Sequence, residues 1–157
     1  MNCESINTVV TSIQAFKDRA AAKDEMQLHR ATVLKTSGPP FFSEICSNLE
    51  SAIDLVNRQL RSDTKITYDK FEELFLFSLN SEVKCEVRLV IGRRHIIFKK
   101  NITTDDPEFR PTSSEMTFFL SVTRDDSVCA KESKTQKLFT SPELMSEYLI
   151  LAAFDNL

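Results

Sequence analysis

Glycine is scarce in this sequence, with two copies in 157 residues, and only five prolines are present. The scarcity argues against the glycine-rich loops that hold nucleotide phosphates, and against collagen-like repeats or flexible linkers. Histidine is equally rare, and neither His29 nor His95 has a second histidine or a cysteine three or four residues away. Zinc sites usually need such a pair, so we expect no zinc ion and no other cofactor.

Long apolar runs are also missing. The longest, Leu149–Phe154, is far shorter than the roughly eighteen residues that a membrane-spanning helix needs. The first thirty residues lack the basic start, apolar run and cleavage site of a secretory signal. The four cysteines form no C-x-x-C pair and are interpreted as reduced thiols, as is usual in cytosolic proteins. These absences predict a cytoplasmic protein with no membrane span.

No serine elbow, phosphate loop or other enzyme signature is present. Cys85 with His95 is the nearest cysteine–histidine pair that could supply a nucleophile and its base. Two acidic loops could offer oxygen ligands to a divalent ion, although aspartate in these contexts more simply indicates turns: Asp105, Asp106, Glu108, Asp125 and Asp126. The sequence therefore predicts no catalytic residue and no metal site, and it favours a non-enzymatic protein.

The composition that remains is that of a folded domain. Hydrophobic residues make up 41% of the chain, twelve of them phenylalanine, and 27% of the residues are charged. A chain of this length buries roughly 70% of the surface that its unfolded form exposes. We therefore predict one domain over residues 1–157 with a large aromatic and aliphatic core.

Two N-terminal helices are predicted, at about residues 5–30 and 41–61. The first has apolar residues at helical spacing, followed by strong helix formers. The second has the clearest periodic pattern of the sequence, from Phe42 to Leu60. Gly38, Pro39 and Pro40 lie between them and are expected to end one helix and start the next.

The hydrophobic period changes to that of strands after Arg61. Five short β-branched or aromatic segments at hairpin spacing, with a weaker sixth near residues 128–139, predict an antiparallel meander over about residues 64–139. A C-terminal helix is expected at about residues 141–154, where Thr140 and Glu143 have capping-box spacing. The fold class is therefore α+β, with helices packed on a five- or six-stranded antiparallel sheet.

The segment Lys84–Lys100 is predicted to form a hairpin around Gly92 and Arg93 in a type II′ turn. This register places Val87 opposite Phe98 on an apolar face, and it sends Cys85 and His95 to opposite faces of the sheet. The segment holds six basic residues and one acid, although the whole chain has a net charge of −3. The positive charge could steer an anionic partner, with contacts from Arg88, Arg93, Arg94 and Lys99.

An alternative explanation of this charge is that basic residues protect a strand edge from aggregation. Nucleic acid is disfavoured as the partner because the polar face of the hairpin has no row of aromatic residues for base stacking.

The sequence also has more apolar residues than one buried face per element requires. The strand around Phe75 and Phe77 is apolar on both faces, and the C-terminal helix, with Leu149 and Phe154, is apolar over more than one stripe. Either the helices cover both sheet faces, or these four residues form an interface with a partner or a second copy. The sequence thus favours a protein-interaction or self-association domain. The alternative is an apolar-ligand pocket between the sheet and the C-terminal helix, lined by Phe77, Leu89, Phe98 and Tyr148 and able to house an activity.

Overall fold

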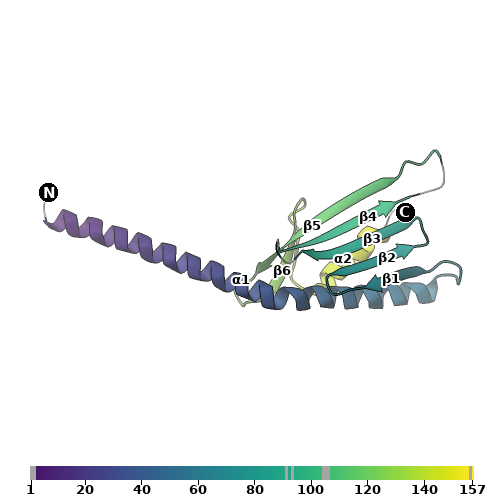
Figure 1. Ribbon diagram of the computed structural model, residues 1–157, viewed down its shortest axis with the longest axis horizontal. Helices are drawn as coiled ribbons and strands as arrows, with labels where there is room; N and C mark the ends of the chain where they lie inside the picture. The colour runs from purple at the N-terminus through teal and green to yellow at the C-terminus, as the bar shows by residue number, and fades with distance from the viewer. Residues whose placement is uncertain (1–2, 91, 93, 104–106, 156) are drawn as a thin grey trace.

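The computed structural model describes residues 3–90, 92, 94–103, 107–155 and 157. In this part of the chain, a long helix is followed by seven strands and a short helix (Figure 1). Their bounds are α1 Cys3–Gln59, β1 Ile66–Lys70, β2 Leu74–Leu79, β3 Val83–Val90, β4 His95–Ile102, β5 Thr112–Val122, β6 Val128–Glu132, β7 Leu138–Phe139 and α2 Pro142–Phe154. The predicted α+β class, antiparallel sheet and C-terminal helix are confirmed.

The two predicted N-terminal helices are one helix, α1, which continues through Gly38, Pro39 and Pro40. Because proline has no backbone N–H, the carbonyls four residues earlier, those of Lys35 and Thr36, lose their usual helical donors. Burial compensates for this loss, since residues on both sides of the prolines pack in the core, from Leu34 and Gly38 to Phe41 and Phe42. Figure 1 shows the axis of α1 changing direction close to where it meets the sheet, and prolines are a usual cause of such bends.

The sheet is a meander in which each strand pairs antiparallel with the next, in the order β1 to β7. The prediction of five or six strands was too low, because residues 128–139 form two strands rather than one. Their turn contains no glycine. It is closed instead by the Glu132 carboxylate, which accepts hydrogen bonds from the backbone N–H and the hydroxyl of Thr135. Such a turn has no strong signal in the sequence.

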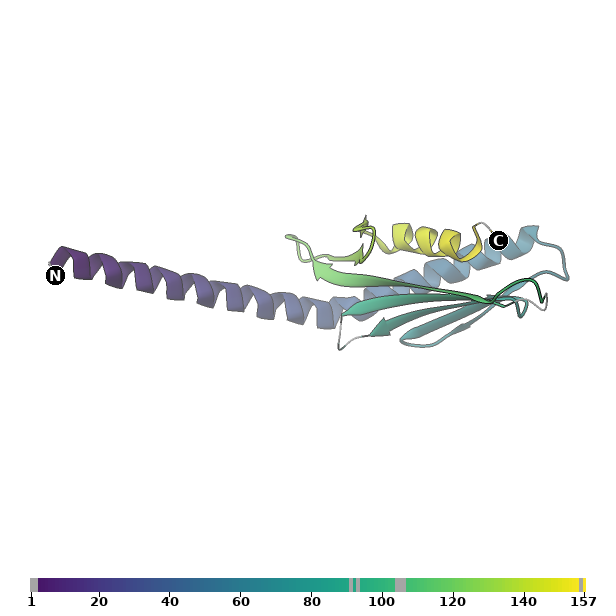
Figure 2. The ribbon, with the colours of Figure 1, turned by 90° about the horizontal axis from the view of Figure 1, so that it is seen from above.

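Both helices lie on one face of the sheet, with α2 beside the C-terminal half of α1 (Figure 2). The Ser146 hydroxyl lies at their contact, 2.6 Å from the carbonyl oxygen of Pro142 in α2 and 3.3 Å from the carbonyl oxygen of Ile45 in α1. The core between the helices and the sheet is aromatic and aliphatic, and its largest fully buried apolar side chains are Phe42, Phe75, Phe98, Phe118, Phe139, Ile45, Leu49, Ile53, Ile96, Met145 and Leu149. No described helix covers the opposite sheet face, where Leu74 and Leu76 are half-buried.

The predicted β3–β4 register is confirmed, with Val87 opposite Phe98 and Val90 opposite His95. The type II′ turn is wrong, since Gly92 does not adopt a positive φ whereas Arg94 has a φ of 56°. The backbone of Arg94 is held in place because its carbonyl oxygen accepts a hydrogen bond from the N–H of Leu120 at 2.9 Å. A hydrogen bond from the neighbouring strand β5 thus anchors Arg94, the residue before β4.

Side-chain hydrogen bonds fix both ends of α2. Ser141, and not Thr140, caps α2, with its hydroxyl accepting from the N–H of Leu144 at 3.3 Å. At the other end of α2, the Lys100 ammonium donates to the carbonyl oxygen of Ala152 at 3.1 Å, which complements the partial negative charge of a helix C-terminus.

Asn57 ties the end of α1 to the first strand. Its side-chain oxygen accepts from the N–H of Ile66 at 2.8 Å, and its side-chain nitrogen donates to the carbonyl oxygen of Ile66 at 2.8 Å. The asparagine therefore forms the pair of hydrogen bonds that a neighbouring strand would otherwise supply.

Candidate interaction surface

The N-terminal half of α1 projects beyond the sheet (Figures 1 and 2). Every described residue from 3 to 30 is exposed, and the side-chain hydrogen bonds of residues 3–28 stay within the helix. At the base of the projection, His29 Nε2 lies 3.0 Å from the Asp126 carboxylate in the β5–β6 turn. The projecting segment is therefore held by its continuity with the buried half of α1 and by this one exposed contact.

The projecting segment carries an exposed apolar row, which we define as Ile6, Val9, Val10, Ile13 and Phe16. These side chains are between 43% and 69% exposed and recur at steps of three and four residues. The same stepping passes the polar or charged Lys23, Gln27 and Arg30 before it reaches Leu34, where α1 enters the core. This face of α1 therefore has an exposed apolar stretch in its first half and a buried apolar stretch in its second half, with a polar stretch between them.

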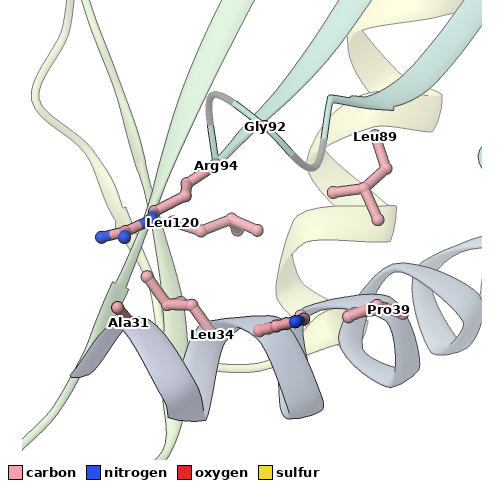
Figure 3. Close-up of a pocket in the computed structure, with 9 residues that line it drawn as sticks. Ala31, Leu34, Pro39, Leu89, Gly92, Arg94 and Leu120 are labelled. Atoms are coloured by element: carbon pink, nitrogen blue, oxygen red, sulfur yellow. The ribbon is translucent and has the colours of Figure 1, made fainter. Parts of the chain in front are cut away.

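A cavity of about 290 Å³, which we call the root pocket, lies where α1 leaves the sheet (Figure 3). Its lining comes from α1, the end of β3, the β3–β4 turn and β5, namely Ala31, Leu34, Lys35, Gly38, Pro39, Leu89, Gly92, Arg94 and Leu120. Figure 3 shows the Arg94 side chain extending from the turn toward α1. Sequence reasoning missed this pocket, because it placed residues 31–38 outside any helix.

The four predicted contacts to an anionic partner are in different environments. Arg88 donates to Glu86 at 2.8 Å, and Lys99 lies 3.7 Å from the Glu115 carboxylate of β5. Arg94 lines the root pocket, and Arg93 lies outside the described residues. The positive charge counted along the hairpin is therefore partly offset by Glu115, which is distant in sequence and adjacent in the sheet.

Three of the four predicted interface residues, Phe75, Phe77 and Leu149, are buried in the core of the chain itself. Phe154 is half-buried, and its ring packs against that of Phe77 with centroids 5.8 Å apart. The apolar surface that these three residues were expected to give to an interface is already covered within the chain.

A second apolar cavity, the end cavity of about 370 Å³, lies between the C-terminal ends of α1 and α2 and strands β1 and β2. Its lining includes Val56, Leu60, Ile66, Leu79, Ile150, Leu151, Phe154 and Leu157. Of the residues predicted to line a ligand pocket, Phe77, Leu89 and Phe98 are buried, and Tyr148 packs on Phe139 with ring centroids 5.0 Å apart. The end cavity is thus at a different place from the predicted one.

Neither Cys46 nor Cys85 is placed to act as a nucleophile. Burial raises the pKa of Cys46 and of Cys85 to about 12, which keeps both thiols protonated. His95 lies on the opposite face of the sheet from Cys85. Its ring contacts the Phe119 ring edge to face, with the ring centroids 4.5 Å apart.

The acidic loops were considered as oxygen ligands for a divalent ion. Asp126 belongs to the β5–β6 turn, with a φ of 60°, and the neighbouring Asp125 accepts a hydrogen bond from the hydroxyl of Thr123. Asp105 and Asp106 lie outside the described residues. Among the residues that are described, no group of three or more His, Cys, Asp or Glu side chains is arranged to hold a metal ion.

No protein-family model, curated protein or solved structure matches this chain. In the described part of the chain, no helix has the length and apolar character needed to cross a membrane.

Proposed function

We propose that this chain is a non-catalytic interaction domain that self-associates through the exposed row of α1. The observation that carries the proposal is a helix that extends beyond its own fold with five large apolar side chains between 43% and 69% exposed. Helices without tertiary contacts are marginally stable in water, so a projecting helix of this kind gains stability from a partner. Apolar residues at alternating steps of three and four are typical of the seam of a coiled coil.

The residue pattern of the exposed row favours a second copy of the chain as the partner, with the two α1 helices parallel. In heptad terms, Ile6 and Ile13 occupy a positions, and Val9 and Phe16 occupy d positions. β-Branched residues at a are a feature of two-stranded parallel coiled coils, in which leucine is the usual d residue; here Val9 and Phe16 take the d positions.

The flanking charges are also compatible with self-pairing. The g positions of the first two heptads are the uncharged Ser5 and Ser12. Arg19 at the next g position would face Asp24 at the e position of the second copy, which is an attractive pair. Lys23 falls at the following d position, where two like charges would meet. The paired segment therefore ends before the root pocket, and the two sheets remain free.

Multi-angle light scattering of the full chain over a range of concentrations tests this proposal. We expect a dimer for the natural chain and a monomer for the double variant Ile13→Asp with Phe16→Asp. The matched control is Ala15→Asp with Ala22→Asp, which adds the same charge at c positions on the outer face and should remain dimeric. A natural chain that stays monomeric at every concentration, or a row variant that stays dimeric, would overturn self-association.

The end cavity favours a second candidate function, the binding of a small apolar ligand. Its lining is almost wholly apolar, and Leu151 at its edge is 56% exposed, so a larger side chain could fill the cavity without disturbing the core. We expect the uncharged probe N-phenyl-1-naphthylamine to fluoresce with the natural chain and with the row variant, but not with Leu151→Trp. Equal fluorescence with Leu151→Trp would exclude the end cavity as the binding site.

A further inference from the structure

The root pocket combines an apolar floor with two cationic side chains. Leu34, Leu89 and Leu120 come from three different elements and supply most of the floor. Lys35 and Arg94 are the charged residues of the lining, which contains no acid. Within the described residues, neither of these two cations forms a salt bridge. Both cations are exposed and remain available to a ligand, whereas Arg88 and Lys99 on the open sheet face already have acidic partners.

Arg94, which lines the root pocket, has a strained backbone conformation. Its φ of 56° lies in the left-handed region, which disfavours residues with a Cβ, while Gly92 two positions earlier does not use that region. The hydrogen bond from the N–H of Leu120 to the Arg94 carbonyl fixes this conformation. Strained residues that the surrounding structure holds in place often occur at binding sites. Here Arg94 is a lining residue, and its side chain extends from the turn past Leu120 at one side of the root pocket (Figure 3).

The size of the pocket limits what can occupy it. Its volume of about 290 Å³ is at or below the lower end of the range of roughly 300–1,000 Å³ for small-molecule sites. One large aliphatic or aromatic side chain suits such a volume better than a nucleotide or other large cofactor. The two exposed cations select a ligand that carries negative charge beside this apolar group.

We propose that the root pocket binds an acidic peptide segment of a partner protein. The segment inserts one large apolar side chain onto the leucine floor and places its carboxylates beside Arg94 and Lys35. This site shares no residue with the exposed row, so it goes beyond self-association and does not depend on it.

Fluorescence anisotropy with three labelled peptides tests the proposal on the full chain. The sequences EEDLDEE, EEDADEE and KKSLSKK vary the central apolar residue and the flanking charge separately. We expect EEDLDEE to bind at least tenfold more tightly than EEDADEE, and KKSLSKK not to bind. Absence of binding by EEDLDEE, or equal binding by EEDADEE, would overturn the proposal, the latter because charge alone would then explain the affinity.

Two variants locate the binding site. Arg94→Gly removes the cation and relieves the positive φ, so the melting temperature should stay unchanged or rise while the affinity for EEDLDEE falls at least tenfold. Ala31→Leu keeps the charge and the helix propensity but fills the pocket, and it should cause a similar loss of affinity.

The control for charge is Arg88→Thr, which removes a cation from the open sheet face and should leave the affinity within about twofold of the natural chain. The monomeric row variant Ile13→Asp with Phe16→Asp should bind EEDLDEE as the natural chain does, which separates this proposal from self-association. Unchanged affinity in both Arg94→Gly and Ala31→Leu would place the binding elsewhere and exclude the root pocket.

Discussion

At the scale of single residues, the turns of this protein depend on side chains other than glycine. Asn80, Arg94, Asp126 and Gln136 all have a positive φ, and each lies in or beside a turn between consecutive strands. Neither glycine has a positive φ, and Gly38 lies inside α1. In the described turns, residues with side chains therefore supply the positive φ, whereas the predicted type II′ turn required it of Gly92.

Gly38 is the residue at which a substitution should stabilise the fold. A Cβ added there would meet Leu120 Cδ1 at 3.9 Å, which is an ordinary contact. Alanine is favoured over glycine inside a helix by about 1 kcal/mol, so Gly38→Ala should raise the free energy of unfolding by roughly 0.5–1 kcal/mol. Urea unfolding measures this. Gly92→Ala is the control, because its Cβ would meet nothing within 4 Å, and it should give a smaller gain. Destabilisation by Gly38→Ala would show that the bend of α1 needs glycine.

Glu132 gives the fold a pH dependence. Hydrogen bonds from the hydroxyl and the N–H of Thr135 lower the pKa of this carboxyl below its ordinary value of 4.5. Its stabilising contribution is therefore present above pH 4.5 and is lost as the pH falls through the lower folded-state value. Between pH 6 and pH 3, the unfolding free energy of the natural chain should fall more steeply than that of Glu132→Gln, as followed by urea titrations. Equal slopes in the two proteins would contradict this role.

At the scale of elements, α1 shows where local sequence signals fail. Gly38, Pro39 and Pro40 are strong local signals for a break, and the prediction of two helices followed them. Burial of Leu34 before the prolines and of Phe41 and Phe42 after them stabilises one continuous helix instead. Periodicity located the strands well because each strand pairs with its neighbour in sequence and buries alternate residues, as the β3 pattern from Val83 to Val90 shows.

The connection from α1 to β1 should depend on both polar atoms of Asn57. Asn57→Ala removes two hydrogen bonds, each worth about 0.5–1.5 kcal/mol, and should lower the free energy of unfolding by about 1–3 kcal/mol. Asn57→Asp keeps the acceptor for the N–H of Ile66 but loses the donor to its carbonyl, so it should cost less. Chemical denaturation of both variants measures the difference. Equal losses for the two variants would show that the donor dominates, because both variants lack it, and a larger loss for Asn57→Asp than for Asn57→Ala would contradict the prediction.

At the scale of the whole molecule, the protein is a sheet with two helices on one face and a long helical extension (Figure 1). The sequence predicted that residues of the exposed row lie on a helix, but periodicity alone cannot tell a stripe that meets the chain's own sheet from one that meets a partner. The root pocket could not be predicted from the sequence, for a different reason. Lys35, Leu89, Arg94 and Leu120 converge only once α1, the β3–β4 turn and β5 are assembled.

Hydrogen exchange should reveal the partner-dependent stability of the extension. If the exposed row pairs with a second copy, amide protection over residues 3–28 should rise with protein concentration, because mass action favours the paired helix. Protection in β3 and β4 should not change with concentration, and these strands serve as the internal control. Protection of residues 3–28 that is independent of concentration would contradict pairing between copies.

The sheet order has a consequence for how the chain acquires its structure. Every strand pairs with its sequence neighbour, so hairpins can form one after another over short loops, which favours fast formation of the sheet. The contact between the helices is different, since Ser146 and Ile45 are 101 residues apart. During synthesis α1 is made before the strands, and the side chains of Phe42, Ile45 and Leu49 remain in water until the strands that cover them emerge. The nascent chain thus exposes more apolar surface on α1 than the finished protein does, and this interval is when it is most prone to associate incorrectly.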